Sequence, residues 1–195
     1  MGQYFKPVIL SETEKPLAWI YSQDVKSKHT TFDGKSTYMG GEGLKLMEHS
    51  YLNNPLVGIV ENLMMPGSKF YKSPLVWAGD YADHEPGSNQ ALYGMAEDRD
   101  KIDTAGLPRK VGKTFRYILN WDLKQYVDKE SLKKDPDGFT IHPLPLLTCE
   151  GNGQGGGDFR GHSKLVGSWA RHHISIETKV PEGFVELKPV FVESY

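Results

Sequence analysis

The sequence predicts an α+β fold in which a mostly antiparallel β-sheet carries one helical layer, within a single domain over residues 1–195. Short runs of β-branched and aromatic residues recur along the chain, and 21 glycines and 12 prolines separate them. This punctuation favours short strands and turns over a helix bundle. The best helical signal is confined to Leu44–Met65, and no repeat or low-complexity linker divides the chain.

A β-hairpin is predicted at the N-terminus. Gln3–Leu10 is rich in residues that favour strands, Ser11–Pro16 is a polar turn, and Leu17–Val25 is the returning strand. The next residues, 26–43, are rich in Lys, Thr, Ser and Gly, and we expect a loop there.

The predicted helical layer is interrupted once. Apolar residues recur at helical spacing through Leu44–Met65, but Pro55 lies inside this stretch. A proline removes one backbone hydrogen bond and clashes with the preceding turn of a helix, and Asn53 and Asn54 before it suit a cap. We therefore expect two short helices or one kinked helix.

The middle of the chain is predicted to contain one buried strand and one long polar segment. Pro74–Tyr81 reads as a core strand. The segment Ala82–Thr114 is too long for an ordinary connection. It is expected either to form a lid-like loop or to carry one short helix near Gln90–Asp98.

The remaining chain is predicted to be extended. Phe115–Asp122 and Gln125–Lys129 form two strands joined by a tight bend. Phe139–Thr148 is another extended run, although its two prolines argue against a central hydrogen-bonded position throughout. Leu165–Thr178 and Val185–Val192 are the closing strands.

Composition excludes several classes of protein. The net charge is −2, whereas a protein that coats duplex nucleic acid carries an excess of basic residues. No apolar run approaches the length that a membrane-spanning helix needs. Cys149 is the one cysteine, so an intrachain disulfide and a cysteine zinc cage are excluded. We expect Cys149 to be a core thiol and the protein to be cytoplasmic, without a membrane partner.

The most unusual stretch is GNGQGGGD, residues 151–158, with five glycines in eight positions. Its backbone N–H groups can converge on an anion, which predicts a ligand-binding loop. A flexible hairpin loop is the alternative. No helix is predicted after it and no Lys-Ser/Thr pair follows, which argues against a dinucleotide-binding turn and a P-loop. The candidate ligand-binding residues of this loop are Gly153, Gly155, Gly156, Gly157 and Asp158.

Charged and aromatic side chains extend this candidate site. Arg160, Lys164 and Arg171 are expected to supply charge for a phosphate. Trp77 and Trp169 are candidates for stacking on a base, and core packing is the alternative. A second basic cluster either binds phosphates or solvates a loop; it consists of Arg109, Lys110, Lys113 and Arg116.

Catalytic and metal-ligating candidates are weaker. Asp80, Asp83 and His84 lie close together in WAGDYADHE and carry ligands that a hard divalent cation accepts, yet such residues are also ordinary turn formers. Asp80 and Asp158 are candidates for acid–base work. His49 is a minor candidate, because Glu48, His49 and Ser50 cannot face one another on a helix and a structural role is favoured.

Several motifs together resemble a known family. The start MGQY, the segments GLKLMEHSY, VWAGDYAD, IHPLPLLT and GNGQGGGD, and then VGSWA are scattered from residue 1 to about residue 170. In this combination they resemble a family of uncharacterised proteins of bacteriophages, prophages and gut-type bacteria. The resemblance implies a phage context and no mechanism. Small phage accessory proteins often act against host defence by binding or destroying a nucleotide signal.

Three functions are therefore expected. The first is an anti-defence protein that binds and sequesters a small anionic, nucleotide-like ligand without a cofactor. The second is a hydrolase of such a ligand that uses a divalent metal. The third is an inhibitor that docks on a host defence protein. The sequence leaves open whether any reaction occurs and whether the protein forms a homo-oligomer.

Overall fold

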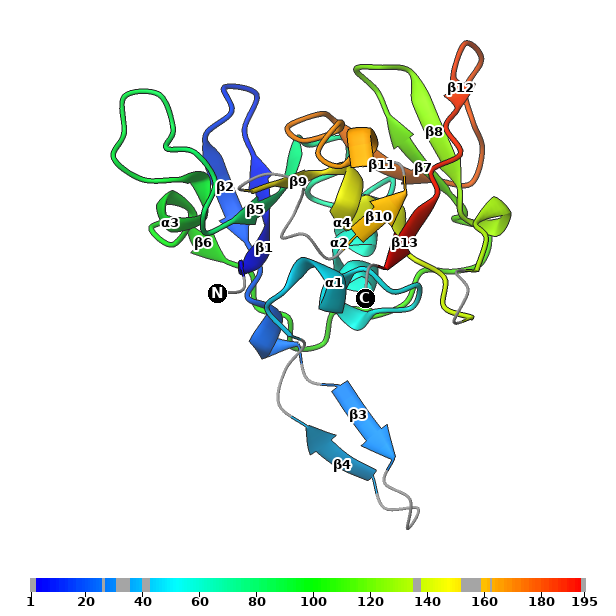
Figure 1. Ribbon diagram of the computed structural model, residues 1–195, viewed down its shortest axis with the longest axis horizontal. Coiled ribbons are helices and arrows are strands. Elements are labelled where there is room, and N and C mark those ends of the chain that lie inside the picture. The colour runs from blue at the N-terminus through cyan, green and yellow to red at the C-terminus, as the bar shows by residue number, and fades with distance from the viewer. Residues whose placement is uncertain are drawn as a thin grey trace.

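Two mixed β-sheets lie on either side of a group of short helices in the computed structural model (Figure 1). The structure describes residues 3–25, 27–30, 36–39, 43–134, 138–151, 159–161 and 163–193. For residues 27–30, 36–39, 159–161, 163 and 192–193 it describes the backbone alone.

The first sheet has five strands in the order β6-β2-β1-β5-β9. Its centre is antiparallel, because β1 pairs with β2 on one side and with β5 on the other. The two outer strands are parallel to their neighbours: β6 pairs with β2, and β9 pairs with β5. The bounds are β1 Phe5–Leu10, β2 Pro16–Trp19, β5 Leu75–Gly79, β6 Asp100–Lys101 and β9 Cys149–Glu150.

The second sheet has four strands in the order β11-β7-β8-β12, and its pairs are antiparallel except for β8 with β12. Two further strand pairs, β3 with β4 and β10 with β13, are antiparallel. Figure 1 shows the pair β3 and β4 extending away from the body.

The predicted α+β, mostly antiparallel architecture is confirmed. The bounds are β3 Ser27–Thr30, β4 Ser36–Met39, β7 Tyr117–Asn120, β8 Gln125–Asp128, β10 Phe159–Gly161, β11 Ile174–Glu177, β12 Val185–Glu186 and β13 Phe191–Glu193.

The predicted break in the helical layer is confirmed. Helix α1 spans Leu46–His49 and helix α2 spans Pro55–Leu63, so the proline stands at the first position of the second helix. The Asn54 side chain accepts hydrogen bonds from the N–H groups of Leu56 and Val57, which are donors that a helix leaves unpaired.

The prediction of an extended run over Phe139–Thr148 is wrong, because Pro143–Leu147 forms helix α4. Pro143 occupies the first helical position, where its missing N–H costs nothing. The imidazole of His142 caps the helix by accepting a hydrogen bond from the N–H of Leu144 at 3.2 Å. All five helical residues are buried, so tertiary packing holds a sequence with two prolines in a helix.

Two predicted strands are shorter than expected. The strand predicted over Leu17–Val25 ends at Trp19, and a 3₁₀ turn, η1, follows at Ser22–Asp24. Most of the strand predicted over Leu165–Thr178 is turns, preceded by η3 at Ser163–Leu165. The backbone takes a positive φ at Gly167 and at Arg171, which is incompatible with a strand.

The long polar segment Ala82–Thr114 carries a short helix, which is one of the two alternatives that the sequence predicts for it. Helix α3, Leu92–Ala96, covers the outer face of the five-stranded sheet and packs on Val8, Leu10 and Val76. Beneath it Lys6 is buried, with its ammonium 2.7 Å from a Glu97 carboxylate oxygen. These contacts fix the segment to the sheet.

The main core lies between the two sheets and joins them through α1, α2 and α4. At its centre Trp77 is fully buried, and its indole N–H donates to Nδ1 of His49 at 3.0 Å. The other ring nitrogen of His49 donates to the carbonyl of Gly43 at 2.6 Å. His49 is therefore a neutral, structural hydrogen-bonding residue, and burial lowers its pKa to about 4.

The pKa of His49 predicts acid sensitivity. The unfolded chain gains this proton near pH 6.5 and the folded protein gains it near pH 4, so stability is lost as the pH falls between those values. The loss should be about 3 kcal/mol. In an NMR titration of the imidazole protons, His49 should titrate near pH 4. His173, which lies between carboxylates that raise its pKa, should titrate above pH 6.5. A His49 midpoint near 6.5 would contradict the buried, neutral assignment.

Candidate functional site

The glycine-rich loop that the sequence singles out lies outside the described residues, and so do the candidate residues Gly153, Gly155, Gly156, Gly157 and Asp158. His162, the other histidine of this region, is also outside them. Just after the loop, Arg160 lies in β10, where the backbone alone is described, and Lys164 is exposed in η3.

Arg171 is engaged by carboxylates. Its guanidinium forms paired hydrogen bonds with Glu150 and with Glu85, and a third carboxylate, that of Glu14, lies 3.5 Å away. These ion pairs join the segment after α4, the long polar segment and the β1–β2 turn. With its donors occupied, Arg171 has the position of a structural crosslink and its charge is neutralised locally.

The two tryptophans predicted to stack on a base are both fully buried. Trp77 packs in the main core beside His49, and Trp169 donates its indole N–H to the side-chain oxygen of Gln125 at 3.0 Å. Neither ring presents a face to solvent, which matches the core alternative.

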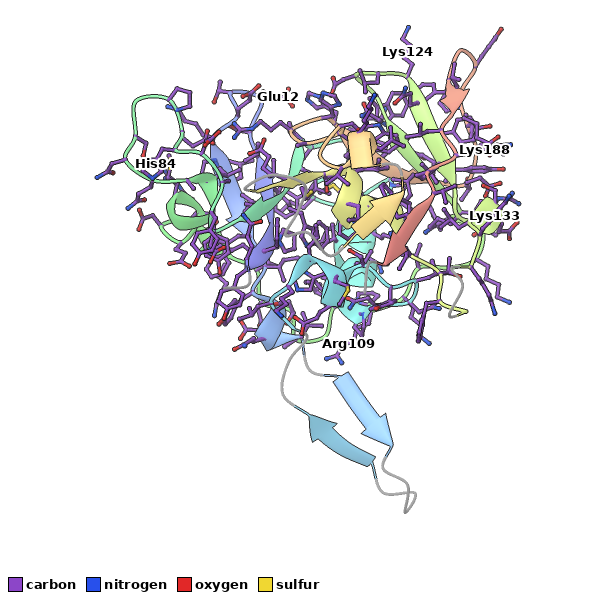
Figure 2. The ribbon with its side chains drawn as sticks, in the orientation of Figure 1. Glu12, His84, Arg109, Lys124, Lys133 and Lys188 are labelled. Carbon is purple, nitrogen blue, oxygen red and sulfur yellow. The ribbon has the colours of Figure 1, made fainter. Side chains whose placement is uncertain are left out.

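The acidic stretch after β5 forms turns. Asp80 accepts a hydrogen bond from the N–H of Tyr4 at 2.9 Å, while Asp83 and His84 are exposed. Figure 2 shows His84 at the end of the molecule that carries α3. Within the described part of the chain, no three His, Cys, Asp or Glu side chains are placed to hold a metal ion together.

The structure instead forms a pocket of about 520 Å³ beside helix α2. One wall is the start of α2 with the residues before it, and the other is the segment 109–116 that leads into β7. The beginning of η2, which spans Lys129–Ser131, and the cap of α4 complete the lining. A volume between about 300 and 1,000 Å³ is typical of small-molecule sites.

The pocket exists because the segment 109–116 crosses α2 at a glycine. A Cβ built on Gly58 would lie 2.0 Å from the carbonyl oxygen of Arg109, so only glycine permits this approach. One turn later the Asn62 amide donates to the carbonyls of Pro108 and Lys110 at 3.1 and 3.2 Å. These bonds hold the crossing segment in place.

Among the charged residues that line the pocket, cations outnumber carboxylates. Lys129 and Arg116 are neutralised, the first by Glu61 and the second by Asp128 and Glu130. The Arg116 guanidinium lowers the pKa of the Asp128 carboxyl, so this pair is ionised at neutral pH. Lys110 and Lys113 are exposed, and no carboxylate among the described residues pairs with either ammonium.

A buried polar network forms the floor. The Glu61 side chain is 7% exposed, and one oxygen, Oε1, lies 2.5 Å from Nζ of Lys129 and 3.2 Å from Nε2 of His142. Because Nδ1 of His142 accepts from Leu144, Nε2 carries the proton that is donated to Glu61. Burial opposes ionisation of Glu61, but His142 and Lys129 outweigh it and lower its pKa.

Apolar side chains complete the site. Four half-buried or buried apolar side chains also line the pocket: Leu52, Val57, Val111 and Phe115. The pocket therefore combines two exposed lysines that lack a carboxylate partner among the described residues, several apolar side chains and a buried carboxylate. It is suited to a ligand with an anionic end and a planar or apolar body.

Sequence reasoning found part of this site. The basic cluster Arg109, Lys110, Lys113 and Arg116, which the sequence predicts either to bind phosphates or to solvate a loop, lines the pocket. The floor was missed, because Glu61, Lys129 and His142 are far apart in the sequence and meet only through packing. One local signal was present, since a glutamate on the apolar helix α2 needs a buried partner.

Comparisons with protein-family models, with curated proteins and with solved structures found no match to this chain. Of the helices in the described part of the chain, none has the length and apolar character that crossing a membrane requires.

The close approach of the segment 109–116 to Gly58 predicts that a larger residue at this position destabilises the folded protein. Gly58→Ala places a methyl group against the Arg109 carbonyl, so the free energy of unfolding should fall by about 1–3 kcal/mol as the segment is displaced. Gly94→Ala in α3 is the matched control, because its nearest neighbour lies at 3.7 Å and alanine favours a helix. Urea unfolding measures both variants. Equal stability of the two would show that the close approach is absent.

Proposed function

We propose that the protein binds and holds a small organic anion, a nucleotide or similar phosphate-bearing molecule, in the pocket beside α2. The observation that carries this proposal is the pair Lys110 and Lys113, exposed cations that have no carboxylate partner among the described residues and that line a pocket with apolar side chains in its walls. Lysine ammonium groups bind phosphate as point charges.

The charge balance within the pocket supports an anionic ligand. Arg116 and Lys129 already have carboxylate partners and serve to build the walls and floor. Lys110 and Lys113 have none among the described residues, and both belong to a segment that α2 holds in place through Asn62. Cations with a fixed backbone and no internal partner are suited to an external one.

The position of the site differs from the one that the sequence favoured. The expected nucleotide ligand is kept, but its phosphate is assigned to the basic cluster and away from Arg171, whose guanidinium is held by Glu85 and Glu150. In the phage context that the sequence resemblance implies, capture would withdraw a nucleotide signal from the host. We propose capture without turnover as the activity.

The proposal is tested by calorimetry and thermal shift with a panel of mono-, di- and cyclic nucleotides. A bound nucleotide should raise the melting temperature and be recovered intact by chromatography after heat denaturation. Lys110→Ala together with Lys113→Ala should weaken binding about tenfold or more, because two phosphate contacts are lost. Added salt should also weaken binding.

Lys124→Ala together with Lys188→Ala is the matched control. Figure 2 shows Lys124 at the edge of the molecule opposite Arg109 and Lys188 at its right-hand side, and neither lysine lines the pocket. Their removal changes the net charge equally and should leave affinity unchanged. Equal losses of nucleotide affinity in the two double variants would show that the effect comes from the net charge of the protein and not from this pocket. A converted nucleotide would contradict capture, and the absence of binding to every nucleotide would reject the proposal.

A further inference from the structure

The floor of the pocket carries a hydrogen-bond acceptor, and this restricts which part of a ligand can reach it. Glu61 lines the pocket, and both of its described contacts, with Lys129 and His142, use the same oxygen, Oε1. Two donors fill the two lone pairs of that oxygen. Among the described residues no donor meets Oε2, so this oxygen keeps its capacity to accept a hydrogen bond from a ligand.

The carboxylate fixes the direction in which an anionic ligand enters. A phosphate placed against Glu61 would bring two anions together at a buried site, where repulsion is strongest. The phosphate therefore belongs at the rim with Lys110 and Lys113, and the other end of the ligand points to the floor.

The positive charge at the floor further restricts which chemical group of the ligand can bind to Glu61. The Lys129 ammonium lies 2.5 Å from Oε1 of the same carboxylate. A protonated amine on Oε2 would lie close to this ammonium and would be repelled by it. A neutral N–H donor meets no such repulsion. The apolar side chains that line the same pocket, among them Val57, Val111 and Phe115, suit a planar, largely apolar ring as its carrier.

We propose that Glu61 is a specificity-determining residue that accepts a hydrogen bond from the exocyclic amino group of a nucleobase. The inference rests on the proposed function and deepens it: the pocket takes nucleotides whose base carries an amino group, in preference to their deaminated counterparts. In a deaminated base an oxygen replaces the amino group, so an acceptor faces the Glu61 acceptor and the hydrogen bond is lost.

Matched nucleotide pairs test this directly in the wild-type protein. Adenosine, guanosine and cytidine monophosphates are compared by calorimetry with inosine, xanthosine and uridine monophosphates, which carry oxygen in place of the amino group. In the pair that binds most tightly, the amino-bearing member should bind about tenfold or more tightly than its counterpart. Equal affinity within that pair overturns the inference while leaving the proposed function intact. No binding by any of the six removes both.

Variants then assign the preference to Glu61. Glu61→Gln replaces the second acceptor with an amide and should bring the affinity ratio within the pair close to one. Inorganic pyrophosphate, which lacks a base, should bind at least as tightly as before, because Lys129 loses its carboxylate partner. Glu182→Gln, at an exposed carboxylate that does not line the pocket, should leave the ratio unchanged.

Glu61→Asp covers the case in which the glutamine variant does not fold. It keeps a charge for Lys129 and draws the acceptor back by one methylene group, so the ratio should again fall. A ratio that persists in every folded Glu61 variant would overturn the assignment.

Discussion

The burial of one carboxylate, that of Glu61, constrains the arrangement around the pocket. An ionised side chain on an apolar helix is strongly destabilising unless charges and hydrogen-bond donors surround it. Here Lys129 comes from the start of η2 and His142 from the cap of α4, so one network joins three elements that are distant in the sequence. The same network places an ionised acceptor at the pocket floor, which determines how a ligand can be oriented there.

Much of the fold could be predicted because the relevant signals are local. Pro55 with Asn54 marks the break between α1 and α2, and β-forming residues mark the central strands of both sheets. Helix α4 escaped prediction, because its two prolines argue against a helix unless Pro143 stands at the first helical position under a His142 cap. That arrangement depends on the buried contacts of α4 with the core, which no local pattern reports.

The site could be predicted only in part, for a related reason. Lysines 110 and 113 are visible in the sequence as a basic cluster, but the same cluster is also typical of a solvated loop. The contact of Gly58 with Arg109 and the contact of Glu61 with Lys129 distinguish a binding site from a solvated loop. Both contacts join residues that are far apart in the sequence. Conversely, the tryptophans and Arg171, which the sequence adds to the glycine-rich candidate site, belong to the core and to a carboxylate cluster.

The central claim, that an anionic ligand binds beside α2, is tested most directly by mapping amide chemical shifts while the tightest-binding nucleotide is titrated in. The account predicts that perturbations concentrate in residues 52–58, 109–116 and 129–130, around the pocket. Perturbations confined to residues 151–161, with none around α2, would contradict it and would return the site to the glycine-rich segment.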